Sequence, residues 1–262
     1  MKKNAIHIVM CLEKSFVPGF LVVVDSICKT ISKNETAHFY LVHKKLPKDE
    51  ISLISSDLES RNIEFNFCKI NSDQLRGLPL LAHFSVEIYF RLLLLKVLPV
   101  SVNKVVYLDC DLLILKNLSV LYNIDLTNKA LAISDNRNSG VMVLNLDFWR
   151  KMDIGNRLIS YIRENPEKCP LPDNDAIIHL LIPEHSVFFS HIWNADHSLR
   201  SDDLGIVHFV GKTKPWHYNY PDNVYRELFF RSLDNTLLKG WRPNQLSRFS
   251  EFFRRVKRRV GF

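Results

Sequence analysis

The chain has 262 residues, of which 47% are hydrophobic and 24% are charged, so it can bury one large core and does not have the composition of a disordered protein. Its net charge is +7, but residues 246–262 hold six cations and one acid, which leaves only +2 for all other residues. A nucleic-acid-binding protein would spread its positive charge over the fold or along a groove, so nucleic acid is not the expected partner.

The first quarter of the chain alternates between strand and helix patterns. Apolar or alternating runs predict strands at residues 5–12, 38–43 and 63–70, and amphipathic patterns predict helices at residues 20–31 and 48–60. Strands that alternate with helices are typical of a mostly parallel sheet covered on both faces. We therefore predict an α/β fold.

The middle of the chain continues this alternation. The patterns predict a helix at residues 87–98, strands at residues 104–108, 130–134 and 141–144, and one long helix at residues 146–163. Pro99 and Pro166 mark the ends of the two helices, because the residue before a proline is disfavoured in helical conformation. After Pro172 the pattern is less regular, and we expect a smaller lobe built on the same sheet.

Neither the cysteines nor the apolar runs indicate a secreted or membrane-spanning protein. The five cysteines are far apart and form no C-x-x-C pair, which argues against a zinc knuckle and fits a reducing compartment. The most apolar segment, residues 88–100, is too short for a transmembrane helix and is interrupted by Arg91 and Lys96. The apolar stretch after Lys2 and Lys3 is also short and lacks a cleavage site, so we expect a cytoplasmic protein.

Two acids follow a short apolar strand. Asp109 and Asp111 come directly after residues 104–108, at the sheet edge where open α/β folds bind ligands. Residues two apart on a strand point to one side, so both carboxylates can face a divalent cation while Cys110 points into packing. Such a cation would bind the diphosphate of a nucleotide sugar. Many D-x-D pairs only cap a turn, but the apolar residues 112–115 enclose these acids, and enclosed carboxylates need a partner.

A second group of candidate ligands lies at residues 208–217, H-F-V-G-K-T-K-P-W-H. Gly211 allows the backbone to approach a phosphate, and Lys214 is a point charge suited to a diphosphate oxygen. His208 could complete a metal site as a neutral imidazole. The alternative is a surface turn with a buried Trp216, since a lone histidine is more often a core residue than a ligand.

Together these segments resemble glycosyltransferase family 8, which includes glycogenin and the bacterial lipopolysaccharide galactosyl- and glucosyltransferases. The resemblance rests on six segments in the same order: residues 8–16 (IVMCLEKSF), 89–92 (YFRL), 104–111 (KVVYLDCD), 138–149 (NSGVMVLNLDFW), 173–175 (DND) and 208–217. It covers residues 8–217, and the ordered set is far more specific than any single segment.

The resemblance implies a GT-A fold and a metal-dependent retaining hexosyltransferase of surface glycan synthesis, of the lipopolysaccharide or capsule type. It would use a UDP-sugar donor, a glycan or glycolipid acceptor, and Mn²⁺ or Mg²⁺. The implied metal ligands are Asp109, Asp111 and His208. The implied donor contacts are Cys11, Glu13, Ser15, Arg91, Asp109, Cys110, Asn138, Gly211 and Lys214. The implied catalytic residues are Asp135, Asp173 and Asn174, with Asn174 beneath the anomeric carbon. A front-side attack by the acceptor is favoured in the family and needs mainly orientation and electrostatics.

Three features depart from the family pattern. Glu13 stands at the uracil-contacting position, where aspartate is usual, and Ser15 stands where asparagine is usual. Asn174 replaces the usual glutamine and is one methylene shorter. Few residues separate Asp135 from Asn138, where relatives often have a longer acceptor-binding loop. These departures leave open a second hypothesis, a catalytically silent protein of the same fold that binds sugar nucleotides or glycans.

The C-terminal residues 246–262 have the pattern of a basic amphipathic helix. Apolar residues recur at spacings of three and four, at Leu246, Phe249, Phe253, Val256 and Val260, with most cations on the flanks and the opposite face. Such a helix lies in a membrane interface, where anionic headgroups contribute about 1 kcal/mol per cation. The alternative is a helix docked on the protein core.

These patterns predict a chain of one catalytic domain and a tail. Residues 1–240 would form a single GT-A domain, with a nucleotide-sugar-binding half at 1–135 and an acceptor-side half at 136–240. Residues 241–262 would associate with an anionic membrane through the segment 246–262. We therefore expect a protein bound peripherally to the inner face of the cytoplasmic membrane.

Overall fold

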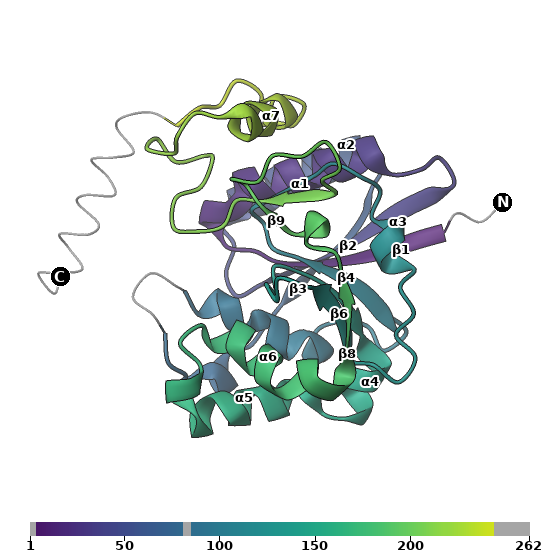
Figure 1. The fold of residues 1–262 in the computed structure, drawn as a ribbon. Helices are drawn as coiled ribbons and strands as arrows, with labels where there is room; N and C mark the ends of the chain where they lie inside the picture. The colour runs from purple at the N-terminus through teal and green to yellow at the C-terminus, as the bar shows by residue number, and fades with distance from the viewer. Residues whose placement is uncertain (1–3, 81–84, 244–262) are drawn as a thin grey trace, which may run out of the picture.

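The computed structural model describes residues 4–80 and 85–243. Its main sheet has seven strands: β1 (Asn4–Cys11), β2 (Glu35–His43), β3 (Glu64–Lys69), β4 (Lys104–Leu108), β6 (Leu131–Ser134), β7 (Val141–Asn145) and β8 (Ser186–Phe189). Their order is β3-β2-β1-β4-β7-β6-β8 (Figure 1). β7 is antiparallel to β4 and β6, and every other neighbouring pair is parallel. The predicted α/β fold with a mostly parallel sheet is confirmed.

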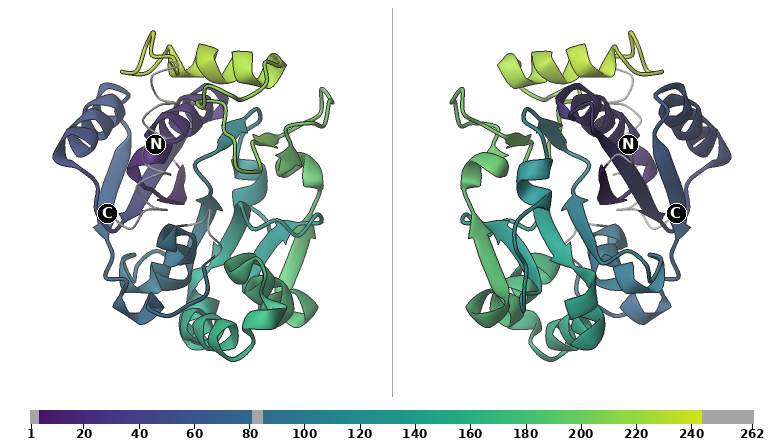
Figure 2. Two further views of the ribbon diagram at one scale, coloured as in Figure 1. Left: turned by 90° about the vertical axis from the view of Figure 1, so that its left-hand side faces the viewer. Right: turned by 90° about the vertical axis from the view of Figure 1, so that its right-hand side faces the viewer.

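Helices cover both faces of this sheet (Figures 1 and 2). One face carries α1 (Val17–Thr30), α2 (Lys48–Ser60) and α7 (Val224–Leu233); the other carries a 3-10 helix (Val86–Lys96), α4 (Leu146–Lys151), α5 (Ile154–Glu164) and α6 (Pro172–His185). A short helix, α3 (Ser119–Tyr122), follows β5 (Leu112–Ile114). Alternate residues of a strand point to opposite faces, so Ile8 and Met10 of β1 enter one core and Val9 enters the other.

A second, three-stranded sheet joins distant parts of the chain. It has the order β5-β10-β9, with β10 (Ile206–His208) antiparallel to β5 and parallel to β9 (Ala195–Asp196). In this register His208 lies opposite Leu112, and the N–H of Phe209 donates to the carbonyl of Asp111 at 2.9 Å. The pairing therefore brings residues 208–209 beside the Asp109–Asp111 link.

The long helix predicted at residues 146–163 is wrong as a single element, because the chain forms α4 and α5 instead. Asp153 separates them in the left-handed conformation, at φ 48°. Aspartate tolerates this conformation better than most residues because its short polar side chain can hydrogen-bond locally, and its carboxylate accepts from Asn156. α5 then packs against the 3-10 helix at Gly155, where an added Cβ would lie 2.3 Å from the carbonyl oxygen of Leu92.

The region after residue 172 is more regular than the sequence suggested. It contains α6, β8 and α7, and β8 joins the main sheet beside β6 as an edge strand. The smaller lobe stays a prediction: β8 belongs to the main sheet, whereas β9 and β10 belong to the second sheet.

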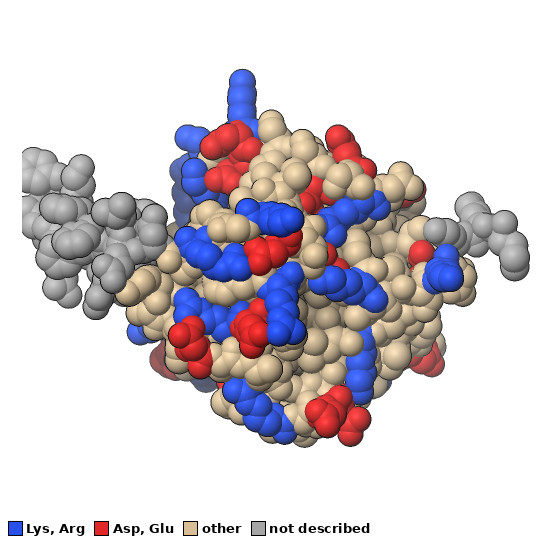
Figure 3. All heavy atoms as spheres, turned by 90° about the horizontal axis from the view of Figure 1, so that it is seen from above, with Lys and Arg blue, Asp and Glu red and all other residues tan. Residues whose placement is uncertain are grey.

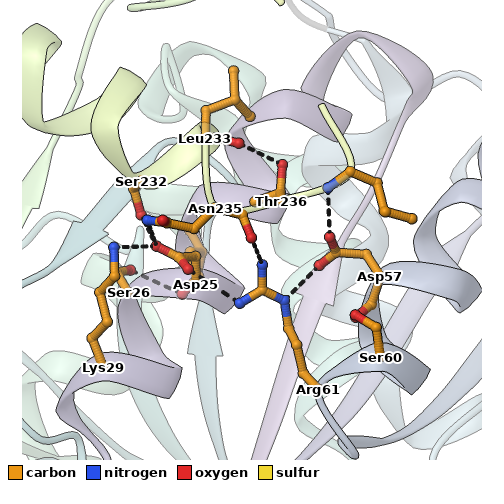
Figure 4. A network of polar contacts seen from close by, with 12 residues as sticks. Asp25, Ser26, Lys29, Asp57, Ser60, Arg61, Ser232, Leu233, Asn235 and Thr236 are labelled. Atoms are coloured by element: carbon orange, nitrogen blue, oxygen red, sulfur yellow. Dashed lines mark hydrogen bonds and ion pairs between the residues drawn. The ribbon is translucent and has the colours of Figure 1, made fainter. Parts of the chain in front are cut away.

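A buried polar network fixes α7 and the turn after it to α1 and α2 (Figure 4). Arg61, which directly follows α2, donates to Asp57 at 2.8 Å, to Asp25 of α1 at 3.1 Å and to the carbonyl of Asn235 at 2.6 Å. Ser232 of α7 also donates to Asp25, at 2.5 Å. Because both acids are almost fully buried, at 2% and 1% exposure, they depend on these partners.

α7 in turn supports the loop that follows β10. Phe229 of α7 stacks on Trp216 at a ring distance of 5.6 Å, and Trp216 lies two residues after Lys214. The face over α7 shows cationic and acidic side chains side by side (Figure 3). The arginines of residues 222–242, Arg226, Arg231 and Arg242, each pair with an acid.

The predicted amphipathic tail, residues 246–262, lies outside the described residues. Within residues 4–80 and 85–243, every helix is too short or too polar to cross a bilayer.

Candidate active site

Asp109, Cys110 and Asp111 form the short link between the two sheets, since β4 ends at Leu108 and β5 begins at Leu112. Backbone hydrogen bonds hold both ends of the link. The N–H of Asp109 donates to Gly140 at 2.8 Å, and the carbonyl of Asp111 accepts from Phe209 at 2.9 Å. The link therefore lies at the carboxyl end of β4 with little freedom to move.

The three residues predicted as metal ligands meet at this link. One ligand atom from each of Asp109, Asp111 and His208 lies within 4.8 Å of the other two. Asp111 and His208 are buried, and Oδ1 of Asp111 lies 3.3 Å from Nε2 of His208. A carboxylate oxygen and an imidazole nitrogen at this distance are stabilised by a cation or a proton between them.

Asn194 and Gly140 hold the imidazole of His208 in place. Nδ1 of His208 lies 2.8 Å from Oδ1 of Asn194, and the side-chain nitrogen of Asn194 donates to the carbonyl of Asn138. The ring also lies against Gly140, where an added Cβ would be 2.3 Å from Cε1 of His208. Sequence reasoning missed both supporting residues. The glycine stands inside the N-S-G segment, but no pattern pointed to Asn194.

Lys214 lies directly beside this cluster. Its ammonium donates to the Asp111 carboxylate and, at 2.8 Å, to the carbonyl of Phe209. Burial alone would raise the pKa of Asp111, but the neighbouring His208 and Lys214 hold it well below its ordinary value. Asp111 is therefore an ionised carboxylate even though it is buried, and its charge depends on these two partners.

Arg91 of the 3-10 helix connects the cluster to the first turn of α6. It donates to Oδ1 of Asp109 at 2.9 Å and lies 3.1 Å from the carboxylate of Asp173. Burial alone would lower the pKa of Arg91, but these acids raise it, so Arg91 is a fixed buried cation. The Tyr107 hydroxyl also donates to Oδ1 of Asp109, at 2.8 Å, and the ring of Tyr107 lies under the guanidinium of Arg91. Oδ1 of Asp109 thus accepts two hydrogen bonds, and Oδ2 of Asp109 lies beside Gly140.

Asp173 and Asn174 begin α6 beside this arginine. Burial raises the pKa of Asp173, while the opposite charge of Arg91 lowers it and the like charge of Asp109 raises it. The side-chain oxygen of Asn174 accepts from the backbone N–H of Ser139 at 2.9 Å. Asp173 is therefore connected to Asp109 through Arg91, and Asn174 is connected through Ser139 to the loop of residues 136–140.

The remaining predicted residues have hydrogen bonds or ion pairs to groups outside the metal cluster. Cys110 donates to the carbonyl of Cys11 at 3.3 Å, and burial raises the pKa of the Cys11 thiol to about 12. Ser15 donates to the carboxylate of Glu13 just after β1. Asp135 is exposed, and its ion pair is with His191 at 3.4 Å rather than with the cluster.

Two further predicted donor contacts, Gly211 and Asn138, lie in loops. Gly211 is exposed at φ 94°, a conformation that glycine adopts at no steric cost. The side-chain oxygen of Asn138 accepts from the backbone N–H of Gly140 at 2.9 Å. These two loops, residues 136–140 and 209–214, therefore flank the link between the sheets.

Comparison with known proteins matches the sequence and the fold of this chain to a family of glycosyltransferases. The model for glycosyl transferase family 8 matches residues 7–137 and 134–220. The glycosyltransferase GlyA of Streptococcus pneumoniae is 27% identical over 85% of this chain, which spans only 34% of that protein. The lipopolysaccharide 1,2-glucosyltransferase of Escherichia coli K12 is 22% identical over 97% of this chain and 85% of its own length.

A solved structure shares the fold. The galactosyltransferase LgtC, in complex with donor and acceptor sugar analogs, superposes with a TM-score of 0.77 at 20% identity, over 88% of this chain and 96% of its own. The predicted GT-A type of α/β fold is confirmed by this likeness.

Proposed function

The chain belongs to glycosyltransferase family 8, and we propose that it moves a hexose from a UDP-sugar to a glycan or glycolipid acceptor, with retention of configuration. The convergence of Asp109, Asp111 and His208 carries this proposal. Similarity to the lipopolysaccharide 1,2-glucosyltransferase of E. coli supports a role in lipopolysaccharide or capsule-type surface glycan synthesis. The donor and acceptor analogs bound to LgtC support the two substrate classes.

The cluster fits a hard divalent cation. Mn²⁺ binds both carboxylates and imidazole, and Mg²⁺ prefers the carboxylates, whereas a thiolate would favour zinc. The nearby thiol of Cys110 donates to the Cys11 carbonyl instead. Asp109, Asp111 and His208 would hold the ion, which when bound supplies positive charge to the leaving diphosphate.

The chain's own cations would complete the donor site. Lys214 lies beside Asp111, within reach of any group that binds at the cluster, and suits a diphosphate oxygen. Arg91 is held by two acids, so it would present a fixed charge to the donor without a reorganisation cost. Gly211 would let the backbone approach the phosphates closely.

Asn174 fits an orienting role better than a nucleophilic one. Its side-chain oxygen already accepts from Ser139, and a neutral amide is a weak nucleophile. This supports a reaction in which the acceptor hydroxyl attacks the face from which the diphosphate leaves. Catalysis would then depend on positioning and on electrostatic stabilisation.

We also propose the division of the chain into a catalytic domain, residues 1–240, and a membrane-associating tail, residues 241–262. The arginines between residues 222 and 242 are paired with acids, so the excess positive charge lies further along the chain. A cytoplasmic enzyme bound to the inner face of the membrane would meet both its soluble donor and a glycolipid acceptor.

Hydrolysis of a panel of UDP-sugars, with and without Mn²⁺, tests the proposal. Wild-type turnover that requires the cation and is lost in Asp109→Asn and in Asp111→Asn supports it. Asp147→Asn, at an exposed acid of α4 that pairs with Arg150, is the matched control and should keep full activity. Binding of a UDP-sugar without turnover, even with acceptors supplied, would instead favour the silent binding protein.

A further inference from the structure

Asn194 is a buried polar residue between the metal cluster and the loop of residues 136–140. Only 2% of it is exposed, and it lies just before β9, outside every segment that the sequence singled out. Its side-chain nitrogen donates to the carbonyl oxygen of Asn138 at 2.8 Å and to the side-chain oxygen of Asn138 at 3.1 Å. Its side-chain oxygen lies 2.8 Å from Nδ1 of His208.

These contacts fix which way the amide of Asn194 faces. Both Asn138 atoms are acceptors, because the same side-chain oxygen also accepts from the N–H of Gly140 at 2.9 Å. A flipped Asn194 would place its oxygen against two other oxygens, so the amide nitrogen must face Asn138. The amide oxygen therefore faces His208.

The orientation of the amide determines the tautomer of His208. An oxygen opposite Nδ1 requires a proton on Nδ1, which leaves the lone pair of a neutral ring on Nε2. Nε2 is the atom that lies 3.3 Å from the Asp111 carboxylate. We propose that Asn194 is a positioning residue that holds His208 in its metal-binding tautomer and ring orientation. This inference rests on the proposed function, because it assumes that the cluster binds a cation.

The surroundings of Asn194 support a fixed orientation rather than an adaptable contact. Its own carbonyl accepts from the side chain of Asn136 at 2.8 Å, so the loop that it contacts also holds its backbone. The Cε1–Nδ1 edge of the imidazole also lies against Gly140. The ring is therefore held by a hydrogen bond at Nδ1 and by the loop backbone, which leaves Nε2 as the nitrogen available to a ligand.

The test compares two variants that keep or remove the acceptor opposite Nδ1, with Mn²⁺ binding to the nucleotide-free protein measured by calorimetry. Asn194→Leu removes the acceptor, and the dissociation constant should rise by about 10- to 100-fold, as for other residues that orient a metal-bound histidine. Asn194→Asp keeps an oxygen opposite Nδ1 but places its second oxygen against the two Asn138 oxygens, so its melting temperature should fall, while its Mn²⁺ affinity should fall much less than that of Asn194→Leu. Wild-type affinity in a folded Asn194→Leu would overturn the proposal.

A matched control separates positioning from general stability. Asn145, at the far end of β7, also donates to a backbone carbonyl, of Leu126 at 3.0 Å, and accepts from an N–H, of Phe148 at 3.0 Å. Asn145→Leu should lower the melting temperature without changing Mn²⁺ affinity. If affinity instead fell in step with melting temperature across Asn145→Leu and both Asn194 variants, the residue would be merely structural and the proposal would be wrong.

Nitrogen-15 NMR of the wild type in the presence of Mg²⁺ gives a measurement that requires no variant. With the cation bound, His208 should show a protonated Nδ1 and an Nε2 without a proton, and a proton on Nε2 would overturn the inference. Asp109→Asn and Asp111→Asn distinguish a failure of the metal site from a failure of the positioning role. If those variants bind Mn²⁺ as the wild type does, the metal site itself is wrong; if only the Asn194 result fails, the positioning role alone is wrong.

Discussion

Gly140 lies so close to His208 that no side chain fits between them. A Cβ at this position would lie 2.3 Å from Cε1 of the imidazole and 2.9 Å from Oδ2 of Asp109. Contacts under 3 Å to two of the three candidate ligands mean that even a methyl group must displace one of them. The glycine of the N-S-G segment is thus a steric requirement of the cluster.

Gly140→Ala should therefore weaken Mn²⁺ binding by at least about tenfold, because His208 or Asp109 must move away from the other ligands. The measurement is calorimetric titration of the nucleotide-free protein with Mn²⁺. Gly155→Ala is the control, since its Cβ would also meet a neighbour, the carbonyl of Leu92 at 2.3 Å, but at the packing of α5. It should lower stability and leave Mn²⁺ affinity unchanged. Equal affinities in Gly140→Ala and the wild type would contradict this account.

The local parts of this site could be predicted from the sequence. The apolar run of β4 followed by two acids places Asp109 and Asp111 at the correct sheet edge without any knowledge of distant contacts. The position of His208 depends instead on the pairing of β10 with β5, which are separated by about ninety residues in a three-stranded sheet that no short-range pattern indicates. Asn194 was missed for a related reason, because its role exists only once β9 and β10 are paired.

The break between α4 and α5 shows a second limit. Apolar periodicity continues across Asp153, so the pattern alone favours one helix. The left-handed conformation of Asp153 decides otherwise, together with the close packing of Gly155 on Leu92. Tertiary packing overrides periodicity here, as it often does at helix ends.

The stability of the metal-free protein should fall as the pH is lowered, in part because of Asp111. Its folded pKa lies below the unfolded value, so its stabilising effect is present above about pH 4 and is lost as the pH falls through the folded pKa. In Asp111→Asn this contribution is absent, so the free energy of unfolding should depend less steeply on pH between about 4 and about 2. Urea unfolding in the presence of a chelator measures both slopes. Identical slopes would mean that the fold does not lower the pKa of Asp111.

Asp173 should have the opposite effect. Its folded pKa is raised, mainly by burial, so its contribution is fully present below the unfolded pKa and is lost as the pH rises through the folded value. At neutral pH the ionised carboxylate therefore lowers stability, and Asp173→Asn should unfold at a higher urea concentration than the wild type. The transferase activity of Asp173→Asn should nevertheless fall, because Asp173 would lie beside the transferred sugar in the proposed donor site. A less stable Asp173→Asn at neutral pH would contradict the direction of the shift.

Arg61→Met should be strongly destabilising. It leaves Asp25 and Asp57 without their main buried partner, and removal of one member of a buried ion pair costs about 3–5 kcal/mol. Arg231→Met breaks the exposed pair with Glu227 and should change the free energy of unfolding by less than about 1 kcal/mol. Chemical unfolding of both variants gives the comparison. A similar small loss in both would show that the network in Figure 4 contributes little to holding α7.

Deletion of residues 246–262 should move the protein from the membrane fraction to the soluble fraction and leave turnover with a soluble acceptor intact. The deleted segment carries six cations and one acid, and each cation contributes about 1 kcal/mol at an anionic surface. Co-sedimentation with vesicles should therefore require anionic lipid and weaken as salt is added. Replacement of the six cations by glutamine, with the apolar residues kept, separates charge from burial of the apolar stripe. Unchanged partitioning after the deletion would place membrane association, if any, elsewhere in the chain, whereas loss of turnover would mean that the segment belongs to the catalytic domain.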